Sequence, residues 1–449
     1  MKRSAWRYLW KSEDIRTKLL ITLMLLVLYR LAANIPVPGI DRGVIQSVVS
    51  SGGAAGTLFG LLDMLSGGTI SNFSILAMGV YPYITAQIIL QLLVPIIPAL
   101  ERRMKENPRE GRKWMEKWTI ILTVPMALLS AIGQVNIFNS LAGQSQQTVL
   151  SFTYGFTGAS LLPTLTLLIS MVAGTMLGIW LGQLISEYGI PNQGLSLIIF
   201  SGIVSQMPSR LVSLWSDKQN GWWLTIVILA IMMLTIFAIV YVQQGRRNVP
   251  VLFPGRRVGN RMSMPVRSNL PLMVNMAGMI PLIFAQSLLL FPAIVASYFV
   301  NAKTAWVASM ASGISAVFGG QSGWYAVMYF VMVVAFTFFY TDVLFQQQNY
   351  GETLKRQGAQ IPGVLRGPAT QKYLTKVQRR ITFPGAFFLG FVAVLPYILN
   401  LFLPASARNA GLLITAAGLL IVVGVVRDTF TIIETELKLH GYDESLIKG

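Results

Sequence analysis

The chain has 449 residues, of which 54% are hydrophobic and 12% charged, and its mean hydropathy is +0.60. Soluble domains carry about 25% charged residues, so the composition excludes an ordinary soluble protein and predicts one that crosses a membrane several times. The sequence has no cysteine, a single histidine (His440) in a polar tail, and no GxxxxGK[ST] phosphate loop. Disulfides and Cys-ligated metal sites are therefore excluded, and hydrolytic, redox and ATPase chemistry lack their usual groups.

Apolar runs of membrane length recur along the whole chain and predict ten transmembrane helices. Residues 1–18 are basic and mixed, and the run that follows is long enough to remain as a span, so we expect no cleavable signal peptide. The predicted spans are residues 19–36, 73–95, 118–138, 161–184, 193–213, 222–243, 273–298, 324–345, 381–402 and 409–429.

A short apolar stretch, TLFGLLDMLS (57–66), precedes the second predicted span. It is apolar enough to favour burial but too short to cross a bilayer. The glycine pair Gly67 and Gly68 follows it and would allow a hinge between the stretch and the span.

Basic residues predict which side of the membrane each loop occupies. Segments 1–18, 96–117, 185–192, 244–272, 346–380 and the tail from 427 hold 29 of the 35 Lys and Arg residues. Because cytoplasmic loops carry the excess of Lys and Arg, both termini are expected in the cytoplasm.

Three of these cytoplasmic segments, 101–117, 243–269 and 346–383, are longer than a helix connection requires. Two interpretations stay open for such basic loops. They can serve membrane topology and attraction to anionic lipids, or they can form a docking surface for an acidic partner such as ribosomal RNA.

Several predicted spans are interrupted by Gly, Pro and polar amides, among them Gln87, Gln91, Asn275 and Gln286. Amides within a membrane need hydrogen-bond partners or water. No Asp, Glu, Lys or His is expected near a mid-membrane position, where ion-coupled transporters and proton pumps usually carry such groups. Ten spans divide into five and five, and an odd half forces the second half to be inverted relative to the first, with a pathway between them.

Two aliphatic pairs, Val80 with Ile84 and Leu195 with Ile199, are spaced four residues apart and so share a helix face. Such pairs are ordinarily core. In a channel, aliphatic side chains that meet at a waist would instead exclude water and ions. Spacing alone leaves both interpretations open.

Six stretches spread over nearly the whole chain match one known family in its order. They are IPVPGID (35–41), LDMLSGGTISNFSILAMGVYPYITAQIILQLL (62–93), GIPNQGLSLIIFSGIV (189–204), LPLMVNMAGMIPLIFAQSLLLFP (270–292), FFYTDVLF (338–345) and GLLIVVGVVRD (418–428). Together they resemble the SecY family of protein-conducting channels.

The resemblance implies an all-α polytopic membrane protein, with ten helices in two inverted halves around an hourglass pore. The halves would be residues 19–213 and 222–429, between a cytoplasmic N-terminal segment (1–18) and a cytoplasmic tail (430–449), with large cytoplasmic loops at 244–272 and 346–380. The membrane would be the bacterial inner membrane. The family is not enzymatic and needs no cofactor or metal. The resemblance implies SecE and SecG as further subunits, the motor SecA or the ribosome as driver, and signal sequences and nascent polypeptides as substrates, which cross the membrane or leave sideways into lipid.

Carried over residue by residue, the resemblance assigns four groups of residues. The plug is the segment of about 57–72, with Leu58, Leu61, Leu62, Met64, Leu65, Gly67 and Gly68. The pore ring is Val80, Ile84, Leu195, Ile199, Ile283 and Ile421. The lateral gate, between the second and third and the seventh and eighth spans, contains Thr85, Gln91, Asn275 and Phe291. SecA or the ribosome would dock on Arg246, Arg247, Arg256, Arg257 and Arg366.

The chain departs from the family pattern in its last large cytoplasmic loop. The family usually has IPGIRPG there, whereas this chain has IPGVLRGP (361–368), so the basic residue Arg366 is displaced by one position.

Two other classes of function compete with a passive channel. A secondary transporter also has broken helices and inverted repeats, but the absence of mid-membrane charge and the large basic loops favour the channel. An intramembrane enzyme would need a catalytic His, Cys or paired Asp, and the sequence does not offer them.

Overall fold

The computed structural model describes most of the chain. The described residues are 12–40, 73–106, 108–144, 158–215, 221–253, 257–258, 261–262, 266–299, 304–318, 322–402 and 416–439.

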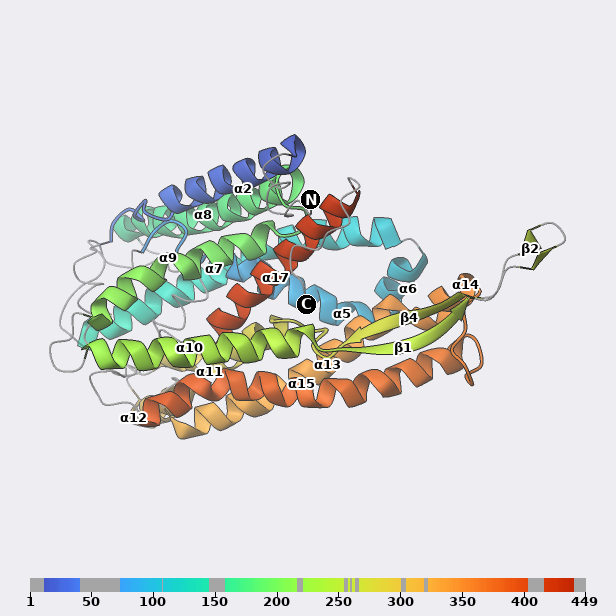
Figure 1. Cartoon of the computed structure of the whole chain (residues 1–449). Coiled ribbons are helices and arrows are strands. Elements are labelled where there is room, and N and C mark those ends of the chain that lie inside the picture. The colour runs from blue at the N-terminus through green and yellow to red at the C-terminus, as the bar shows by residue number, and fades with distance from the viewer. Residues whose placement is uncertain are drawn as a thin grey trace.

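Long helices lie roughly side by side and make up most of the described chain (Figure 1). In chain order they are α2 (Glu13–Ala32), α5 (Tyr81–Ile96), α6 (Pro98–Glu106), α7 (Pro108–Gln144), η1 (Gly158–Ser160), α8 (Leu161–Tyr188), α9 (Gly194–Trp215), α10 (Gly221–Gln244), α11 (Ile280–Phe299), α12 (Ala305–Phe318), α13 (Gly323–Gln348), α14 (Tyr350–Arg356), α15 (Pro368–Phe402) and α17 (Ala416–Leu439).

Each of the ten predicted spans overlaps one described helix, but several boundaries differ. Helix α5 begins at Tyr81 and α11 at Ile280, seven or eight residues later than hydropathy predicted, because Gly79 and Gly278 turn the chain with positive φ angles just before them. The sequence stays apolar through both turns, so hydropathy does not show where the helices begin. At the other end, α17 continues to Leu439, into the predicted tail.

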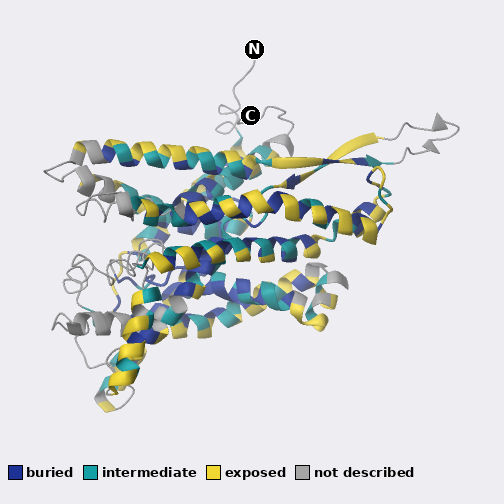
Figure 2. Cartoon of the chain, turned by 90° about the horizontal axis from the view of Figure 1, so that it is seen from below, coloured by how far each residue is buried: buried dark blue, intermediate teal, exposed yellow. Residues whose placement is uncertain are grey.

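Five described helices are long and apolar enough to cross a membrane, and a sixth span results if α5 and α6, which bend by 92° at their junction, are taken together. Large apolar side chains are also exposed on the outside of the molecule, including Leu23 on α2, Leu162 on α8 and Phe237 on α10. Figure 2 shows the same division, with buried residues in the middle of the bundle and exposed residues on its outer faces. The chain is a multi-pass membrane protein.

The expectation of an all-α fold is wrong in the region predicted as the cytoplasmic loop 244–272. Strands β1 (Arg246–Phe253) and β4 (Val266–Met273) pair antiparallel, with Arg246 opposite Met273 and Phe253 opposite Val266. Two shorter strands, β2 (Arg257–Val258) and β3 (Arg261–Met262), pair farther out. Val249 and Val251 are buried while Pro250 between them is exposed, which is the period of two expected of a half-buried strand.

The other segments predicted as long basic loops are largely helical. Residues 101–117 lie in α6 and in the first turns of α7, and residues 346–380 include α14 and the first turns of α15. Segment 357–361 also joins the hairpin, since Leu252 and Gln360 exchange two backbone hydrogen bonds of 2.8 and 2.9 Å.

These parts share a hydrophobic core of their own. Its buried members are Val249, Val251, Leu272, Phe345, Leu354, Ala359, Ile361, Leu374 and Ile381. We call the β1–β4 hairpin, α14 and the first turns of α15, with this core, the platform. In Figure 1 the hairpin and α14 lie together at one end of the bundle.

The packing among one group of five described helices (α2, α5, α7, α8 and α9) is repeated in a second group (α10, α11, α13, α15 and α17). Contacts of α2 with α8 and α9 correspond to those of α10 with α15 and α17. Likewise α5 packs on α7, α7 on α8 and α8 on α9, just as α11 packs on α13, α13 on α15 and α15 on α17. The two groups meet where α9 packs against α10 and α17, and where α7 packs against α11.

Candidate functional site

Six aliphatic side chains belong to one large hydrophobic cluster, which also includes residues of α2 and α8. They are the predicted ring residues Val80 and Ile84 of α5, Leu195 and Ile199 of α9, Ile283 of α11, and Ile421 of α17. Val80, Ile199, Ile283 and Ile421 are at most 6% exposed, and half-buried Ile84 and Leu195 pack against the same cluster. Residues up to 341 positions apart in sequence, as Val80 and Ile421 are, therefore belong to the same cluster, and their assignment to a pore ring stays a prediction.

A close backbone approach holds the segment that leads into α5. A Cβ atom on Gly174 of α8 would lie 1.9 Å from the carbonyl oxygen of Ile75, a distance that no side chain can occupy. Gly174 therefore allows α8 to pack directly on this segment. Five residues later, Val80 takes the N-cap position of α5 and enters the cluster.

A second close approach fixes the start of α9. A Cβ atom on Gly194 would lie 1.8 Å from the carbonyl oxygen of Gly182 in α8, and a Cβ atom on Gly182 would lie 2.7 Å from Cδ2 of Leu195. The two glycines thus let α8 and α9 meet backbone to backbone. This contact sets the position of Leu195, the first ring residue of α9.

Helix α11 is preceded by a turn that a side chain closes. The amide of Asn275 accepts a hydrogen bond from the Gly278 N–H at 3.0 Å and donates one to the Gly278 carbonyl at 3.2 Å. Gly278 has a φ of 63°, which glycine adopts without the penalty that a Cβ atom brings. Ile283 follows one turn into the helix.

The six predicted ring residues are hydrocarbon side chains. Aliphatic side chains that line a constriction exclude water and ions. Within the described residues, no group of three or more His, Cys, Asp or Glu side chains is placed to hold a metal ion.

Of the predicted lateral-gate residues, Thr85 and Gln91 lie on α5, Phe291 lies on α11, and Asn275 lies in the turn before α11. The Thr85 hydroxyl is buried and donates to the Pro82 carbonyl within α5 at 2.9 Å. Gln91 accepts a hydrogen bond from the Tyr340 hydroxyl of α13 at 2.7 Å. Asn275 is buried in its own turn, and the Phe291 side chain lies outside the described part of the structure.

Sequence reasoning missed Tyr340, although the stretch FFYTDVLF that contains it was singled out. Its partner is 249 residues away, so no local spacing marks the pair. Gln286, noted for its polarity, is buried on α11, and its Oε1 has no hydrogen-bond partner among the described residues.

The predicted plug, residues 57–72, lies outside the described residues, so the structure does not test it.

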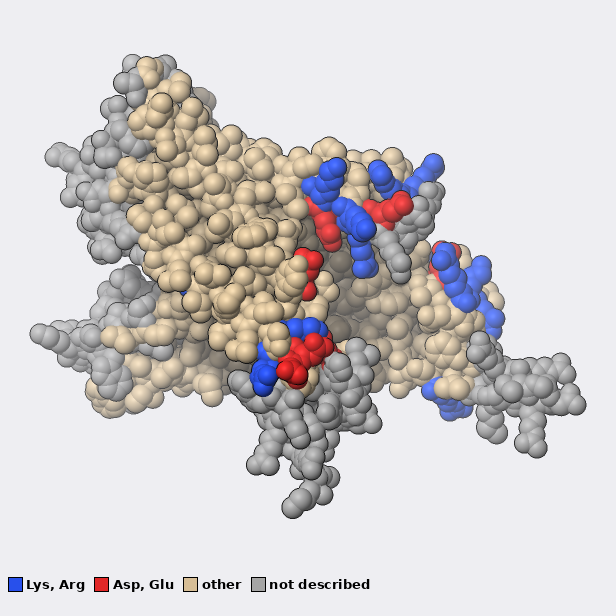
Figure 3. All heavy atoms as spheres, turned by 90° about the horizontal axis from the view of Figure 1, so that it is seen from above, with Lys and Arg blue, Asp and Glu red and all other residues tan. Residues whose placement is uncertain are grey.

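The predicted docking arginines belong to the platform or to its extension. Arg246 and Arg247 are exposed at the start of β1, and Arg366 donates from Nε to the Gln360 side chain at 3.1 Å. Arg257 lies in β2, and Arg256 lies outside the described residues. In the face shown in Figure 3, charged side chains gather over one part of the molecule and the rest of the coloured surface is uncharged.

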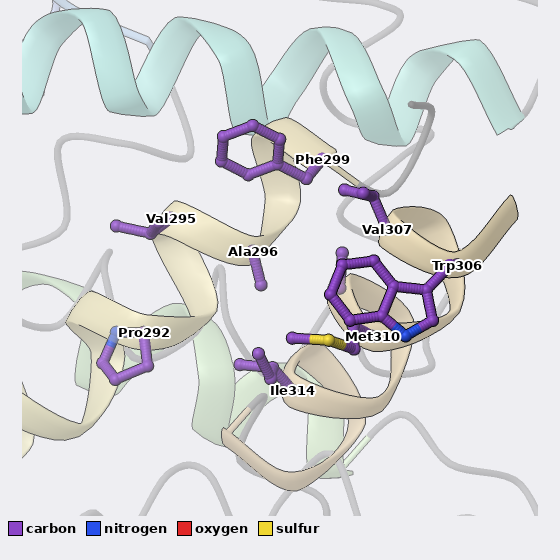
Figure 4. A pocket seen from close by; sticks show the side chains of 9 residues that line it. Pro292, Val295, Ala296, Phe299, Trp306, Val307, Met310 and Ile314 are labelled. Carbon is purple, nitrogen blue, oxygen red and sulfur yellow. The ribbon is translucent and has the colours of Figure 1, made fainter. Parts of the chain in front are cut away.

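An apolar cavity of about 330 Å³ lies between the end of α11 and α12, away from the ring residues. Side chains of the two helices, such as Ala296 and Met310, face it from either side (Figure 4). Its lining is hydrocarbon, indole and thioether, without the convergent polar groups that orient a substrate.

Comparisons with known proteins agree over nearly the whole chain. A family model described as SecY matches residues 74–430. The protein translocase subunit SecY of Streptomyces scabiei is 35% identical over 442 residues, covering 98% of this chain and 99% of the relative. The protein of the same description from Aquifex aeolicus is 36% identical over 432 residues, covering 96% of each chain.

Solved structures share the fold. One, reported as the structure of a protein conducting channel, superimposes with a TM-score of 0.61 at 18% identity and covers 98% of this chain and 99% of its own. Another is of a SecY protein whose plug domain is reported to stabilise the closed state of the translocation channel. It has a TM-score of 0.60 at 19% identity, again over 98% of this chain and 99% of its own.

Proposed function

The chain belongs to the SecY family, and from that premise we propose that it is a passive protein-conducting channel. Unfolded secretory polypeptides would pass through it across the membrane, and hydrophobic segments would leave it sideways into lipid. The channel itself performs no catalysis in this proposal.

The observation that carries the proposal is that one hydrophobic cluster includes six aliphatic side chains from α5, α9, α11 and α17. Branched hydrocarbon side chains fit around an extended chain of any sequence, because they make no directional contacts. When the chain is absent they close on each other and leave no polar surface for ions. The six residues would thus form a ring that seals the closed pore.

The proposed architecture has ten spans in two inverted five-helix halves, residues 19–213 and 222–429, around an hourglass pore. The repeated helix packing supports it, since the pairs α2–α8, α2–α9, α5–α7, α7–α8 and α8–α9 recur five helices later. The segment 57–72 would be a plug on one side of the ring. Its modest apolar surface would make displacement inexpensive in free energy.

The lateral gate in this proposal is the seam between α5 with α7 and α11 with α13. Thr85 and Gln91 of α5, Phe291 of α11, and Asn275 in the turn before α11 would border it. When the seam opens, a segment in the pore meets lipid, and each apolar residue of the segment favours transfer by a few tenths of a kcal/mol.

The platform would receive the driver, which is either the SecA motor or the translating ribosome. Its exposed residues Arg246 and Arg247 fit an acidic partner, and Arg256, Arg257 and Arg366 would extend the same surface. SecE and SecG would be further subunits, and anionic lipids would border the basic side. The proposed location is the bacterial inner membrane, with the N-terminal segment 1–18 and the tail 430–449 in the cytoplasm.

The proposal is tested by reconstituting the chain with SecE, SecG, SecA and ATP in vesicles. An unfolded secretory protein added outside should become protected from protease, and small solutes should show no uptake driven by an ion gradient. Gradient-driven solute uptake without protein import would contradict the proposal and favour a secondary transporter.

A further inference from the structure

The inference begins with the apolar cavity of about 330 Å³ between the end of α11 and α12. Each wall contributes one deeply buried residue, and both are small: Ala296 of α11 is 4% exposed and Ala311 of α12 is 5% exposed. The other lining side chains are half-buried or exposed. The cavity therefore exists where two helices present alanines, and a larger side chain at either position would occupy part of it.

The chemistry of the lining favours a hydrocarbon occupant over water. Hydrocarbon, indole and thioether groups line the cavity, and they offer water few hydrogen-bond partners. Apolar cavities of about 150 Å³ stay dry and take up small hydrocarbons. A dry void also leaves its wall atoms without dispersion contacts, which an apolar occupant restores.

The rim of the cavity is continuous with the outer face of the bundle. Val295, Phe299 and Met310 line the cavity and are also exposed on the surface. In a protein that crosses the membrane several times, exposed apolar side chains of this kind meet lipid tails. The hydrocarbon that can reach the cavity from outside is therefore the acyl chain of a lipid.

Helix α12 has the features of a helix that lies at the membrane–water interface. It is at the end of the bundle away from the platform (Figure 1). Ser309 and Ser312 are exposed on one face, whereas Ala311 and Ile314 line the cavity on the opposite face. Trp306, at the start of the helix, is 73% exposed. Amphipathic helices and exposed tryptophans are typical of the level where lipid headgroups meet the hydrocarbon.

We propose that this cavity binds one acyl chain of a membrane phospholipid, which enters from the bilayer between α11 and α12. The acyl chain would fill the space beside Ala296 and Ala311, with the headgroup near the level of Trp306. Neither helix has a charged residue, so the two helices recognise the hydrocarbon and not the headgroup. The bound acyl chain would also brace the end of α11, where Pro292 removes a backbone hydrogen bond from the helix.

The inference needs only that the protein crosses a membrane, so it stands or falls separately from the proposed function. The test places the reconstituted full-length protein in nanodiscs that contain a phosphatidylcholine with a photoreactive diazirine in one acyl chain. After illumination, mass spectrometry locates the label. The measured quantity is the label on residues 292–299 and 305–314 divided by the label on residues 233–237 of α10, an exposed stretch that reports ordinary contact with lipid.

Three variants are compared with the parent. Ala311→Leu and Ala296→Leu fill the cavity from opposite walls. Ala305→Leu is the matched control, because Ala305 is an exposed alanine of the same helix α12 and does not line the cavity.

The parent should be labelled more strongly around the cavity than on α10. Either cavity variant should lower the ratio by about tenfold, because leucine replaces about three carbons of the acyl chain and the roughly ten wall contacts that they make. Ala305→Leu should leave the ratio unchanged. A phosphatidylglycerol with the same photoreactive acyl chain should give the same ratio as the phosphatidylcholine.

A ratio that stays at the parent's value in both cavity variants would overturn the proposal, since the label would then report ordinary contact only. Label on α10 with none around the cavity would also overturn it, because another segment or a partner subunit would then cover the site. A ratio that depends on the headgroup would contradict recognition of the hydrocarbon. If the melting temperature shows that Ala311→Leu does not fold, Ala296→Leu decides the question.

Discussion

Helices α5 and α11 begin alike and are held differently. Each follows a glycine with positive φ, Gly79 at 53° and Gly278 at 63°, and each has a proline in its first turn. The sequences correspond as well, since GVYPYITAQ (79–87) and GMIPLIFAQ (278–286) share Gly, Pro, Ile, Ala and Gln at the same positions. The shared Ile is Ile84 in one and Ile283 in the other, and both join the ring cluster.

The segments in front of the two helices have different anchors. The segment before α5 is held inside the bundle, by α8 at Gly174 and by a hydrogen bond of 3.0 Å from the Ile75 N–H to the Ile35 carbonyl. The segment before α11 continues directly from β4 of the platform, and the Val274 N–H donates to the Gly245 carbonyl at 2.9 Å.

This difference has a mechanical consequence. Residues 274–279 alone separate the platform from α11, so a partner that moves the platform can act on α11 and on Ile283. The segment before α5 instead packs on α8 at Gly174, and α5 itself packs on α7. In the proposed function, a driver on the platform would act more directly on α11 than on the segment that leads into α5, and the predictions below test this contrast.

The largest effect is expected where α5 is anchored. Gly174→Ala places a Cβ atom against the Ile75 carbonyl oxygen, which belongs to the backbone and cannot easily move away. The substitution should reduce the free energy of unfolding by about 3 kcal/mol. Gly278→Ala meets no atom within 4 Å and is penalised for its positive φ, by about 1 kcal/mol. Thermal unfolding in detergent measures both. Equal losses would mean that α8 does not anchor the segment before α5.

Substitutions in the ring should change conductance more than stability. Ile283→Asn and Ile421→Asn put an amide into the closed cluster, which favours the hydrated open state by roughly 1–3 kcal/mol. Ion conductance across a bilayer should rise by about ten- to a hundredfold, and secretory proteins with defective signal sequences should be exported.

The matched control for the ring is Leu282→Asn. Leu282 is next to Ile283 and equally buried, but it packs in the other cluster, with Leu389 and Leu420. This variant should lose stability without gaining conductance. If the ring variants behave in the same way as Leu282→Asn, the ring residues are ordinary helix-packing core.

The segments that precede the two helices give a smaller effect. Deletion of residues 58–71, ahead of α5, should raise resting ion conductance severalfold while protein translocation stays measurable. The reason is that the deletion removes a seal and leaves the ring in place. A deletion variant as tight as the parent would contradict the assignment of the plug.

The smallest effect is expected on the platform side. Arg256→Glu with Arg257→Glu reverses two charges beyond the β1–β4 hairpin and should weaken binding of SecA or the ribosome by about tenfold at low salt. The loss should shrink as salt rises, because screening shortens the range of exposed charges. Arg16→Glu serves as the control, because it reverses the charge of an exposed side chain on α2, away from the platform. Unchanged binding at low salt would leave these arginines a topological role.

The helices could be predicted from hydropathy because long apolar runs have few other outcomes in a membrane protein. The ring could not be predicted from spacing, since Val80 and Ile84 share a face in any helix, and the partners on α9, α11 and α17 are far away in sequence. The resemblance to a family supplied what spacing lacks. The contact of Tyr340 could not be predicted for the same reason, because its partner Gln91 lies 249 residues away in sequence.

The hairpin was missed although the sequence carries its signal. In RRNVPVLF the alternation of Val249 and Val251 with exposed residues predicts a strand. The segment was instead interpreted as a basic loop because of its many arginines. The late starts of α5 and α11 were missed because the turns at Gly79 and Gly278 lie within apolar sequence. In both cases local backbone chemistry mattered more than average hydropathy.

The central claim is that a translocating polypeptide passes through the ring, and crosslinking tests it most directly. The chain has no cysteine, so a single introduced cysteine is the sole site of reaction. Ile84→Cys, Ile199→Cys, Ile283→Cys and Ile421→Cys would each be paired with a secretory protein arrested in mid-translocation and carrying one cysteine. Leu234→Cys and Phe237→Cys, on the exposed face of α10, are the controls.

The account predicts disulfide crosslinks from all four ring positions to the arrested polypeptide and none from the two α10 positions. Ring positions that stay unlinked while the polypeptide is arrested in the same complex would contradict it.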